Sequence, residues 1–258
     1  MPRIAVVTGA AQGVGFATAA LLARTGYEVV LTDVQALDEP LERLQREALR
    51  VRGVVGDVAS EAFVQSLAER VSADYGAADV LVNNAGISLI CAAEATTAAQ
   101  WQRVMSINLL GPFLLSKYLG AAMLARRRGS IVNVASVAGL AAVSHRSAYN
   151  ASKHGLIGLT RTLAAEWGGR GVRVNAVCPG WIKTEMDVAD QGSGAYSDQD
   201  IIDRVPMARF ARPEDVAATI VYLADGEKSS FVNGVSLPVD GGWSSDASWD
   251  SLRIRTRS

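Results

Sequence analysis

An apolar run that passes through three glycines into a helical pattern indicates the fold class at the start of this chain. Residues 3–8 are apolar and β-branched, as expected for a strand covered on both faces. The sequence T-G-A-A-Q-G-V-G follows at 8–15, and a helical pattern then continues to Thr25. Glycines between a strand and a helix let the backbone approach a pyrophosphate, with the positive helix end facing it. We interpret the segment as a dinucleotide-binding turn; the alternative is a turn that merely needs positive φ.

Strand-like and helix-like segments alternate along the rest of the chain, which predicts a parallel sheet wound by helices on both faces. Further strands are predicted at 27–33, 51–55, 80–86, 130–136, 172–180 and 234–239, and further helices at 41–50, 61–75, 100–128, from 149 on and from 213 on. The helix at 100–128 is expected to break near Gly111-Pro112.

The pattern contains no linker or internal repeat, so we expect a single domain over residues 1–242 of the 258-residue chain. Periodicity is lost at 181–205, which predicts a substrate loop there. Residues 243–258 form a C-terminal tail that is either disordered or an arm across a subunit boundary.

Charge and cysteine content point to a cytoplasmic protein that binds neither nucleic acid nor membrane. The formal net charge is −1, and the two cysteines, Cys91 and Cys178, have no metal-ligand or C-x-x-C spacing. We therefore expect no metal site, and both cysteines to fill the core. The uncharged run at 4–23 is long enough to span a bilayer, but its glycines favour a buried strand, a turn and a buried helix.

Tyr149 and Lys153 are four residues apart at the start of a predicted helix, so they lie on one face, one turn apart. A lysine beside a phenol favours the phenolate and lowers the phenol pKa from about 10 toward neutrality. Ser136, at the end of a predicted strand, can hold a substrate oxygen nearby. This combination suits proton transfer on an alcohol or a carbonyl. The alternative is an exposed tyrosine beside a solvated lysine.

Asp33 ends the second predicted strand and predicts the choice of cofactor. An acid at this position can accept hydrogen bonds from the adenosine ribose hydroxyls and repel a 2′-phosphate. No arginine or lysine stands at Gln12, Val34 or Gln35 to bind that phosphate. The sequence therefore favours NAD(H) over NADP(H).

Three asparagines lie near the expected ligand edge of the sheet. Asn83 and Asn84 end a predicted strand, where they either contact a cofactor or tie neighbouring strands together. Asn108 precedes the expected helix break, where freed backbone groups can bind water or the Lys153 ammonium.

Together these residues resemble the short-chain dehydrogenase/reductase family, from residue 3 to about 242. The matching pieces are T-G-A-A-Q-G-V-G at 8–15, Asp33, Asp57, N-N-A-G at 83–86, Asn108, Ser136, Y-N-A-S-K at 149–153, P-G-W-I-K-T at 179–184 and D-G-G at 240–242. The resemblance implies a three-layer, doubly wound α/β fold, Rossmann-like, with a seven-stranded parallel sheet.

The resemblance also implies an active tetrad of Asn108, Ser136, Tyr149 and Lys153. In that pattern Tyr149 exchanges the proton, Ser136 binds the reacting oxygen, Lys153 lowers the tyrosine pKa and binds the nicotinamide ribose, and Asn108 holds a water. Family members are commonly tetramers or dimers packed through the two long helices, so we expect a homo-oligomer, with the tetramer favoured. The implied cofactor contacts are Gly9, Gln12, Gly13, Val14, Gly15, Asp33, Asp57, Val58, Asn84, Ala85, Gly86, Tyr149, Lys153, Pro179, Gly180, Ile182 and Thr184.

The leading hypothesis is an NAD-dependent dehydrogenase that interconverts a secondary alcohol, polyol or sugar-like, and a ketone. The alternative is a 3-oxoacyl carrier-protein or acyl thioester reductase, favoured by the arginines at 126–128 and by Arg170 and disfavoured by Asp33. An idle cofactor-sensing or scaffold protein would be expected to lack a tetrad residue, and all four are present. Substrate contacts are expected from Ser136, His145, Trp181 and Met186.

Overall fold

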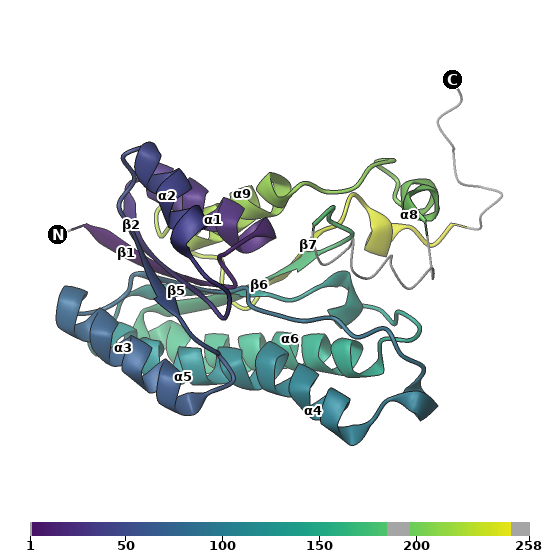
Figure 1. Ribbon diagram of the computed structural model, residues 1–258, viewed down its shortest axis with the longest axis horizontal. Coiled ribbons are helices and arrows are strands. Elements are labelled where there is room, and N and C mark those ends of the chain that lie inside the picture. Colours follow the sequence, from purple (N-terminus) through teal and green to yellow (C-terminus); the bar gives the residue numbers. More distant parts are fainter. Residues whose placement is uncertain (1, 185–196, 249–258) are drawn as a thin grey trace.

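A seven-stranded parallel sheet forms the centre of the protein, whose computed structural model describes residues 2–184 and 197–248 (Figure 1). The strand order is β3-β2-β1-β4-β5-β6-β7, so the direction of winding reverses between β1 and β4. The carboxyl ends of the strands at such a reversal open a crevice where ligands bind. The strands are β1 (Arg3–Thr8), β2 (Tyr27–Asp33), β3 (Val51–Val55), β4 (Val80–Asn83), β5 (Gly129–Val134), β6 (Val172–Pro179) and β7 (Ser236–Val239).

Helices cover both faces of the sheet, and the predicted three-layer, doubly wound α/β fold with a seven-stranded parallel sheet is confirmed. In Figure 1 the upper layer contains α1 (Gly13–Arg24), α2 (Asp38–Arg46) and α9 (Pro213–Ala224). The lower layer contains α3 (Glu61–Tyr75), α4 (Ala98–Met105), α5 (Gly111–Ala125) and α6 (Ser147–Trp167).

The apolar strands supply two hydrophobic cores, one on each side of the sheet. Successive strand residues point to opposite faces. Accordingly Val7 joins the core that contains Leu22 and Ile220, whereas its neighbour Val6 joins the core that contains Leu115. Fully burying a side chain of this size stabilises the fold by about 1.5–3 kcal/mol relative to leaving it exposed. The sheet therefore requires apolar residues on both faces of its strands, and the polar residues of the site lie where the strands end.

The long helix predicted at 100–128 continues past Gly111-Pro112 rather than breaking there. A five-residue π-helical segment, Ser106–Leu110, joins α4 to α5. Pro112 stands in the first turn of α5, directly after this segment, and its missing N–H deprives a carbonyl of the π-segment of a hydrogen-bond donor. The distortion is centred on Asn108, four residues earlier than the proline. Single-turn π-segments of this kind are frequent at functional sites.

Helix α2 runs from Asp38 to Arg46 instead of 41–50. Asp38 and Glu39 stabilise its first turn through the helix dipole, and the backbone leaves the helix before Ala48, which has a positive φ of 56°. Within the stretch 181–205, the structure contains a short helix, α8 (Asp198–Arg204), started by a capping box between Ser197 and Asp200.

The three arginines at 126–128 follow the end of α5, and two of them bind Asp79 at the start of β4. Arg126 and Arg128 lie 3.2 and 3.1 Å from an Asp79 carboxylate oxygen, while Asp79 also accepts the Ile4 backbone N–H at 2.7 Å. These contacts tie the end of α5 to the edge where β1 and β4 begin.

One helical run in the described residues, Ala98–Ala125, is long and apolar enough by composition to cross a membrane. More than half of its apolar window, 56%, is buried inside the protein, where it packs in the lower helical layer. Such a run is typical of the core helix of a globular domain, so its hydropathy carries no evidence for membrane insertion.

Candidate active site

The glycine turn brings the backbone of β1 against the end of β4. Gly9 has φ of 63°, and a Cβ there would lie 2.8 Å from Ala85 Cα; a Cβ on Gly15 would lie 2.0 Å from the Gly9 carbonyl oxygen. No larger residue fits either position without moving backbone. Helix α1 begins directly after, and its N-cap residue, Gln12, makes no side-chain capping hydrogen bond. The first N–H groups of α1 and its positive end are thus suited to a pyrophosphate.

Two of the asparagines hold this edge together. Asn84 Nδ2 donates to the carbonyl oxygens of Thr8 and Gly9, at 2.9 and 3.0 Å. Asn83 Nδ2 donates to Asn133 Oδ1 of β5 at 2.8 Å. Of the two interpretations left open by the sequence, strand tying fits the Nδ2 contact of Asn83, which is not among the cavity-lining residues. Asn84 ties the strands and also lines the cavity described next.

A cavity of about 360 Å³ lies along the carboxyl edge of the sheet. Of the cofactor contacts implied by the sequence, all except Gly15 line it, and the lining also includes Ser136 and Trp181. Of the predicted catalytic and substrate residues that the structure describes, Asn108 and His145 do not line the cavity. Val34 and Gln35, which the sequence placed beside the adenosine ribose, and Ile87 also line it. Lining residues that the sequence did not indicate are Gly56, Arg103, Ile107, Val134, Ala135, Val137, Ala138, Val143 and Arg146.

The Asp33 carboxylate lies at one end of this cavity and is held by two backbone donors. Ala11 N–H and Gln35 N–H each donate to it at 3.0 Å, which fixes its orientation beside the glycine turn. Val34 next to it is 64% exposed and apolar. The carboxylate retains lone pairs for further donors, so it can accept hydrogen bonds from ribose hydroxyls.

Asp57 lies at the same end and is paired with Arg103, 3.0 Å away. Burial raises the pKa of Asp57, but the Ala59 N–H and the Arg103 guanidinium outweigh burial, so the net pKa is lowered. Arg103 comes from α4, and nothing in the local sequence around Asp57 indicates this partner.

Lys153 is 4% exposed and forms part of the cavity wall, with its Nζ donating to the Val134 carbonyl oxygen at 2.8 Å. The same Nζ lies 5.6 Å from the centroid of the Tyr149 ring. Burial lowers the pKa of Lys153 to about 8. An anionic oxygen near this ammonium would favour its charged form, and in return the ammonium would favour an anionic phenol oxygen.

Asn108 lies in the π-helical segment and is fully buried. Its Nδ2 donates to the Ile87 carbonyl oxygen at 2.9 Å and to Ser152 Oγ at 3.1 Å, and its Oδ1 accepts the Ile87 N–H at 2.9 Å. A Cβ added to Gly86 would lie 3.3 Å from Asn108 Oδ1 and 3.5 Å from Lys153 Nζ. Gly86, Asn108 and Lys153 therefore meet at the cavity wall, with Asn108 behind the two lining residues.

Ser136 follows β5 at the cavity wall, where its Oγ accepts the Ala138 N–H at 3.1 Å. This contact orients the hydroxyl and leaves its proton for another acceptor. Cys178, on the adjacent strand β6, is fully buried, and burial raises the pKa of its thiol to about 11, as expected of a core-filling cysteine.

The predicted substrate contacts have different positions. Trp181 lines the cavity and packs on Trp243, with 5.1 Å between ring centroids. His145 is exposed and lies outside the lining, whereas its neighbour Arg146 is part of it. Met186 lies outside the described residues.

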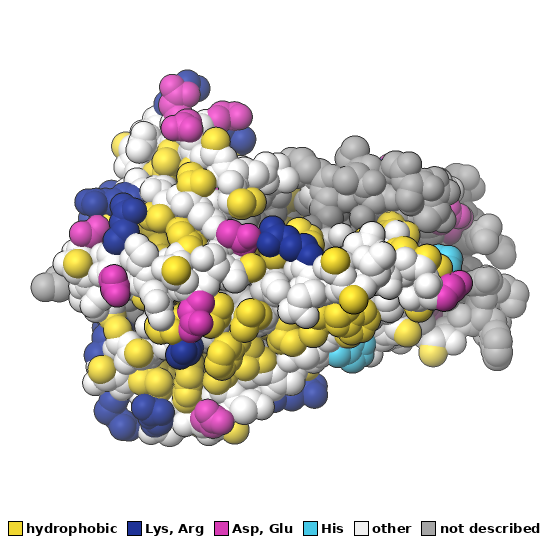
Figure 2. All heavy atoms as spheres, turned by 60° about the horizontal axis from the view of Figure 1, so that its bottom comes forward, with side chains coloured by type: hydrophobic (Ala, Val, Ile, Leu, Met, Phe, Trp, Pro, Cys, Tyr) yellow, Lys and Arg dark blue, Asp and Glu magenta, His cyan; other side chains and the backbone are white. Residues whose placement is uncertain are grey.

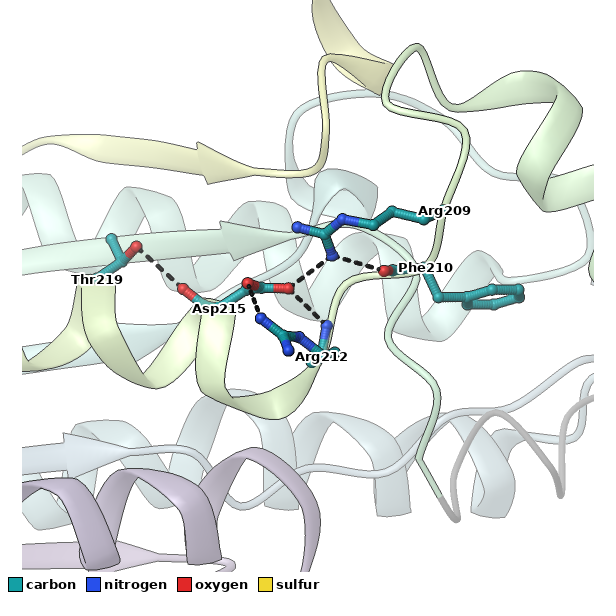
Figure 3. A network of polar contacts seen from close by, with 5 residues as sticks. All are labelled: Arg209, Phe210, Arg212, Asp215 and Thr219. Atoms are coloured by element: carbon teal, nitrogen blue, oxygen red, sulfur yellow. Dashed lines mark hydrogen bonds and ion pairs between the residues drawn. The ribbon is translucent and has the colours of Figure 1, made fainter. Parts of the chain in front are cut away.

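The polar network in Figure 3 holds residues 209–215, a segment that contacts Trp181 through Ala211. Ala211 pairs with Ile182 in an isolated bridge and donates its N–H to the Trp181 carbonyl oxygen at 2.9 Å. Asp215, in the first turn of α9, binds Arg209 at 2.7 Å and the Arg212 N–H at 2.9 Å. The hydrogen bond from the Arg209 side chain, and to a lesser extent that from the Arg212 N–H, lowers the pKa of Asp215 to about 2. The network thus fixes this wall of the cavity to α9.

Known proteins share this arrangement over nearly the whole chain. A family model described as Enoyl-(Acyl carrier protein) reductase matches residues 9–244. D-threitol dehydrogenase of Mycolicibacterium smegmatis is 39% identical over 246 residues, covering 93% of this chain and 92% of the relative. A 3-oxoacyl-[acyl-carrier-protein] reductase of Thermotoga maritima is 38% identical over 244 residues, covering 93% and 97%. The chain belongs to the short-chain dehydrogenase/reductase family.

The solved structure of a variant of actinorhodin polyketide ketoreductase with NADPH, another relative, superposes with a TM-score of 0.90 at 34% identity, covering 95% of this chain and 98% of that chain. Membership confirms the family inferred from the sequence. It also makes this chain an NAD(P)-dependent oxidoreductase that acts on alcohols or ketones.

The buried lysine leads to a prediction about stability and pH. Because its pKa is about 8 in the folded protein, against an ordinary lysine value of 10.5, the unfolded state binds more protons between these pH values. The free energy of unfolding of wild type should therefore rise relative to that of Lys153→Met by about 2–3 kcal/mol from pH 8 to 10.5, and run parallel to it below pH 8. Urea unfolding at several pH values measures this. Lys117→Met is the control: it lacks an exposed lysine but keeps Lys153, so its free energy of unfolding should rise relative to that of Lys153→Met as wild type does. Parallel curves for wild type and Lys153→Met at every pH would contradict the burial effect.

Proposed function

We propose that the chain is an NAD(H)-dependent dehydrogenase that interconverts a secondary alcohol, polyol or sugar-like, and its ketone. The observation that carries the proposal is that Tyr149, Lys153 and Ser136 line the same cavity as the glycine turn and Asp33. A proton-transfer group and a dinucleotide site therefore share one space. The likeness to D-threitol dehydrogenase supports a polyol as substrate.

The residues divide the reaction between them. The bound nicotinamide supplies hydride acceptance and return. In oxidation the alcohol carbon gives up a hydride, Tyr149 as phenolate takes the hydroxyl proton, and the products are the ketone, the reduced cofactor and a proton. Ser136 donates a hydrogen bond to the reacting oxygen and so orients it. General acid–base help of this kind contributes about 10²–10⁴-fold.

Lys153 and Asn108 support Tyr149. The Lys153 ammonium favours the phenolate and would bind the nicotinamide ribose. Its Nζ is close enough to the cavity for this, because it would lie 3.5 Å from a Cβ on the cavity-lining Gly86. Asn108 holds the Ile87 backbone behind Lys153, where a water can link the ammonium to solvent. Asp57 and Val58 would lie at the adenine, and the segment from Pro179 to Thr184 at the nicotinamide.

Tyr149→Phe should abolish turnover and leave NADH binding nearly intact, because the substitution removes only the proton-transfer hydroxyl. Steady-state oxidation of a panel of secondary alcohols, with NADH affinity from fluorescence titration, measures both effects. Tyr222→Phe removes a hydroxyl on α9, outside the cavity, and should keep wild-type turnover. A Tyr149→Phe enzyme that still oxidises an alcohol at the wild-type rate would refute the assignment.

The choice of NAD rests on Asp33. A carboxylate fixed by Ala11 and Gln35 repels a 2′-phosphate, and the exposed neighbour Val34 offers no cation to bind one. The related polyketide ketoreductase variant was solved with NADPH, so the preference depends on this site and not on the fold.

We expect kcat/KM to be higher with NAD than with NADP by about tenfold or more, and Asp33→Asn to reduce this ratio. Initial rates with both cofactors at fixed alcohol concentration test the prediction. Asp38→Asn, at the exposed start of α2, is the matched control and should keep the ratio. A wild-type preference for NADP would overturn the NAD proposal.

A 3-oxoacyl carrier-protein or acyl thioester reductase is the second candidate. The Thermotoga maritima relative and the description of the matching family model favour it. The arginines at 126–128 support it less than their sequence suggested, because Arg126 and Arg128 already bind Asp79. Initial rates on an acetoacetyl thioester with NADPH that exceed those on every polyol with NAD would establish this candidate.

We propose a homo-oligomer, with the tetramer that the family resemblance implies favoured over a dimer, and the lower helical layer supports self-association. Figure 2 shows hydrophobic side chains gathered across the face made by these helices. Exposed large apolar side chains of this layer include Leu110 in the π-segment and Phe113 in α5, 41% and 43% exposed. Contiguous apolar surface of this kind marks protein–protein contacts.

Phe113→Asp should therefore shift the protein to a smaller species, because it places a charge in the contact. Sedimentation velocity gives the mass of both proteins, and Lys117→Met, on the same helix, is a control for a change of charge near that face. A monomeric wild type would contradict the homo-oligomer.

We further propose one catalytic domain over residues 1–242, with the substrate loop at 181–205 and the tail at 243–258, in the cytoplasm. The free thiols of Cys91 and Cys178 support a reducing compartment. Of the tail, the described part includes Trp243, which packs on the cavity-lining Trp181.

A further inference from the structure

Arg103 lines the cavity at the adenosine end and has no role in the mechanism above. It comes from α4, and its Nη1 lies 3.0 Å from Asp57 Oδ2, in a pair whose side chains are 54% and 34% exposed. The other carboxylate oxygen, Asp57 Oδ1, accepts the Ala59 N–H at 2.9 Å. Each oxygen of the carboxylate therefore has one fixed donor, and two separate segments of the chain set the plane of the group.

Asp57 is close to the residue that is proposed to bind the adenosine ribose. The Gly56 N–H donates to the Asp33 carbonyl oxygen at 2.8 Å, so the turn that carries Asp57 is joined to the end of β2. In the proposed site the pyrophosphate lies at the start of α1 and the ribose at Asp33. Beyond the ribose, the purine base of the cofactor meets the part of the lining that includes Asp57 and Arg103.

The backbone on both sides of the ion pair is fixed. The Asp57 carbonyl oxygen accepts the Ser60 N–H at 2.9 Å, and Ser60 caps the first turn of α3. Arg103 lies in the last turn of α4, a helix that begins with a capping box between Thr97 and Gln100. An ion pair this exposed contributes little to stability, so its consequence for function is the orientation that it gives to Asp57.

The chemistry of the two groups predicts opposite preferences for the base. An ionised carboxylate only accepts hydrogen bonds, whereas a guanidinium only donates them. Because each Asp57 oxygen retains a lone pair, the carboxylate can accept the 6-amino group of adenine, and it repels the 6-oxo group of hypoxanthine. A guanidinium that faced the base directly would favour the 6-oxo group. The preference of the site for one base therefore shows which of the two groups reads it.

We propose that Arg103 is a positioning residue that holds Asp57 as an acceptor for the purine amino group and so makes the site selective for adenine. The guanidinium acts on the base through the carboxylate and not by a contact of its own. This inference rests on the proposed dinucleotide site and adds to it a residue from a distant helix. Arg103 takes no part in hydride or proton transfer, so turnover at saturating cofactor should not depend on it.

Two reduced cofactors that differ in the purine test the inference: NADH and reduced nicotinamide hypoxanthine dinucleotide. Fluorescence titration gives the Kd of each without turnover. For wild type we expect NADH to bind more tightly by about tenfold or more. Arg103→Met should reduce this preference by about threefold or more, and Arg103→Lys should keep part of it because the charge remains. The comparison of variants isolates the Asp57 contact, since the 6-oxo base also carries a proton on N1.

Arg24→Met is the matched control. It breaks an ion pair of similar length and exposure, in which Arg24 lies 2.9 Å from Glu47 with its side chain 52% exposed. Arg24 ends α1, at the opposite end of that helix from the glycine turn, and does not line the cavity. This variant should keep the wild-type preference for NADH.

Asp57→Asn separates positioning from direct contact. Asparagine replaces one acceptor oxygen by a donor, so the preference for NADH should fall in this variant. Arg103→Met should then have no further effect, because the carboxylate through which Arg103 acts is gone. A preference that falls again by the same factor in the double variant shows that Arg103 contacts the base itself and overturns the inference. An unchanged or increased preference in a folded Arg103→Met also overturns it.

Kinetics separate failure of this inference from failure of the proposed activity. With an active alcohol, Arg103→Met should raise KM for NAD and leave kcat and the KM of the alcohol nearly unchanged. If no alcohol is oxidised with either cofactor, the proposed activity fails, while the titrations still test Arg103. A wild type that binds both purines equally overturns the inference alone, and one that binds neither overturns both proposals. Thermal unfolding of each variant shows whether it is folded.

Discussion

A lysine ammonium removed from water behind the sheet edge is the constraint on which the site depends. Removing such a charge from solvent is costly, and the lowered pKa of Lys153 expresses that cost. The Val134 carbonyl oxygen and the Tyr149 ring are the contacts that partly offset it. Gly86 lies close by: a Cβ there would lie within ordinary contact distance of the ammonium, at 3.5 Å, and closer to Asn108 Oδ1, at 3.3 Å. An anionic oxygen that forms near the ammonium offsets part of this cost of burial. The buried charge therefore favours the phenolate on which proton transfer depends.

The local parts of this arrangement were predictable from the sequence, and the tertiary parts were not. The glycine turn, Asp33 at a strand end and the Tyr149–Lys153 spacing are each set by neighbours in the chain, so patterns of a few residues indicate them. Arg146 lines the cavity and His145 does not, and the backbone at His145 has a positive φ of 58°. A histidine in the sequence does not indicate a positive φ, so this difference could not be predicted. Arg103 pairs with a carboxylate 46 residues away, and no local pattern contains that distance.

The same division appears in the secondary structure. Helix α8 has a usable local signal, because Ser197 and Asp200 have the spacing of a capping box, but it is short and lies in a segment without periodicity. The π-helical segment has no such signal. The proline indicated a break, yet the backbone rearranges around Asn108, whose side chain bonds to Ile87 and Ser152 in other elements. The ring and the missing N–H of Pro112 act on the carbonyl of Asn108, four residues earlier, so the proline accounts for a distortion at this place and the Asn108 contacts hold it there.

The contact between Trp181 and Trp243 gives the protein an internal optical reporter. The two indoles are 5.1 Å apart and inclined by 56°, close enough for their electronic transitions to couple, and one of them lines the cavity. Any molecule that enters beside Trp181 changes the polarity around this pair, and a bound reduced nicotinamide absorbs where indoles emit. Near-ultraviolet circular dichroism and emission quenching thus report occupancy directly, without a label and before any product has formed.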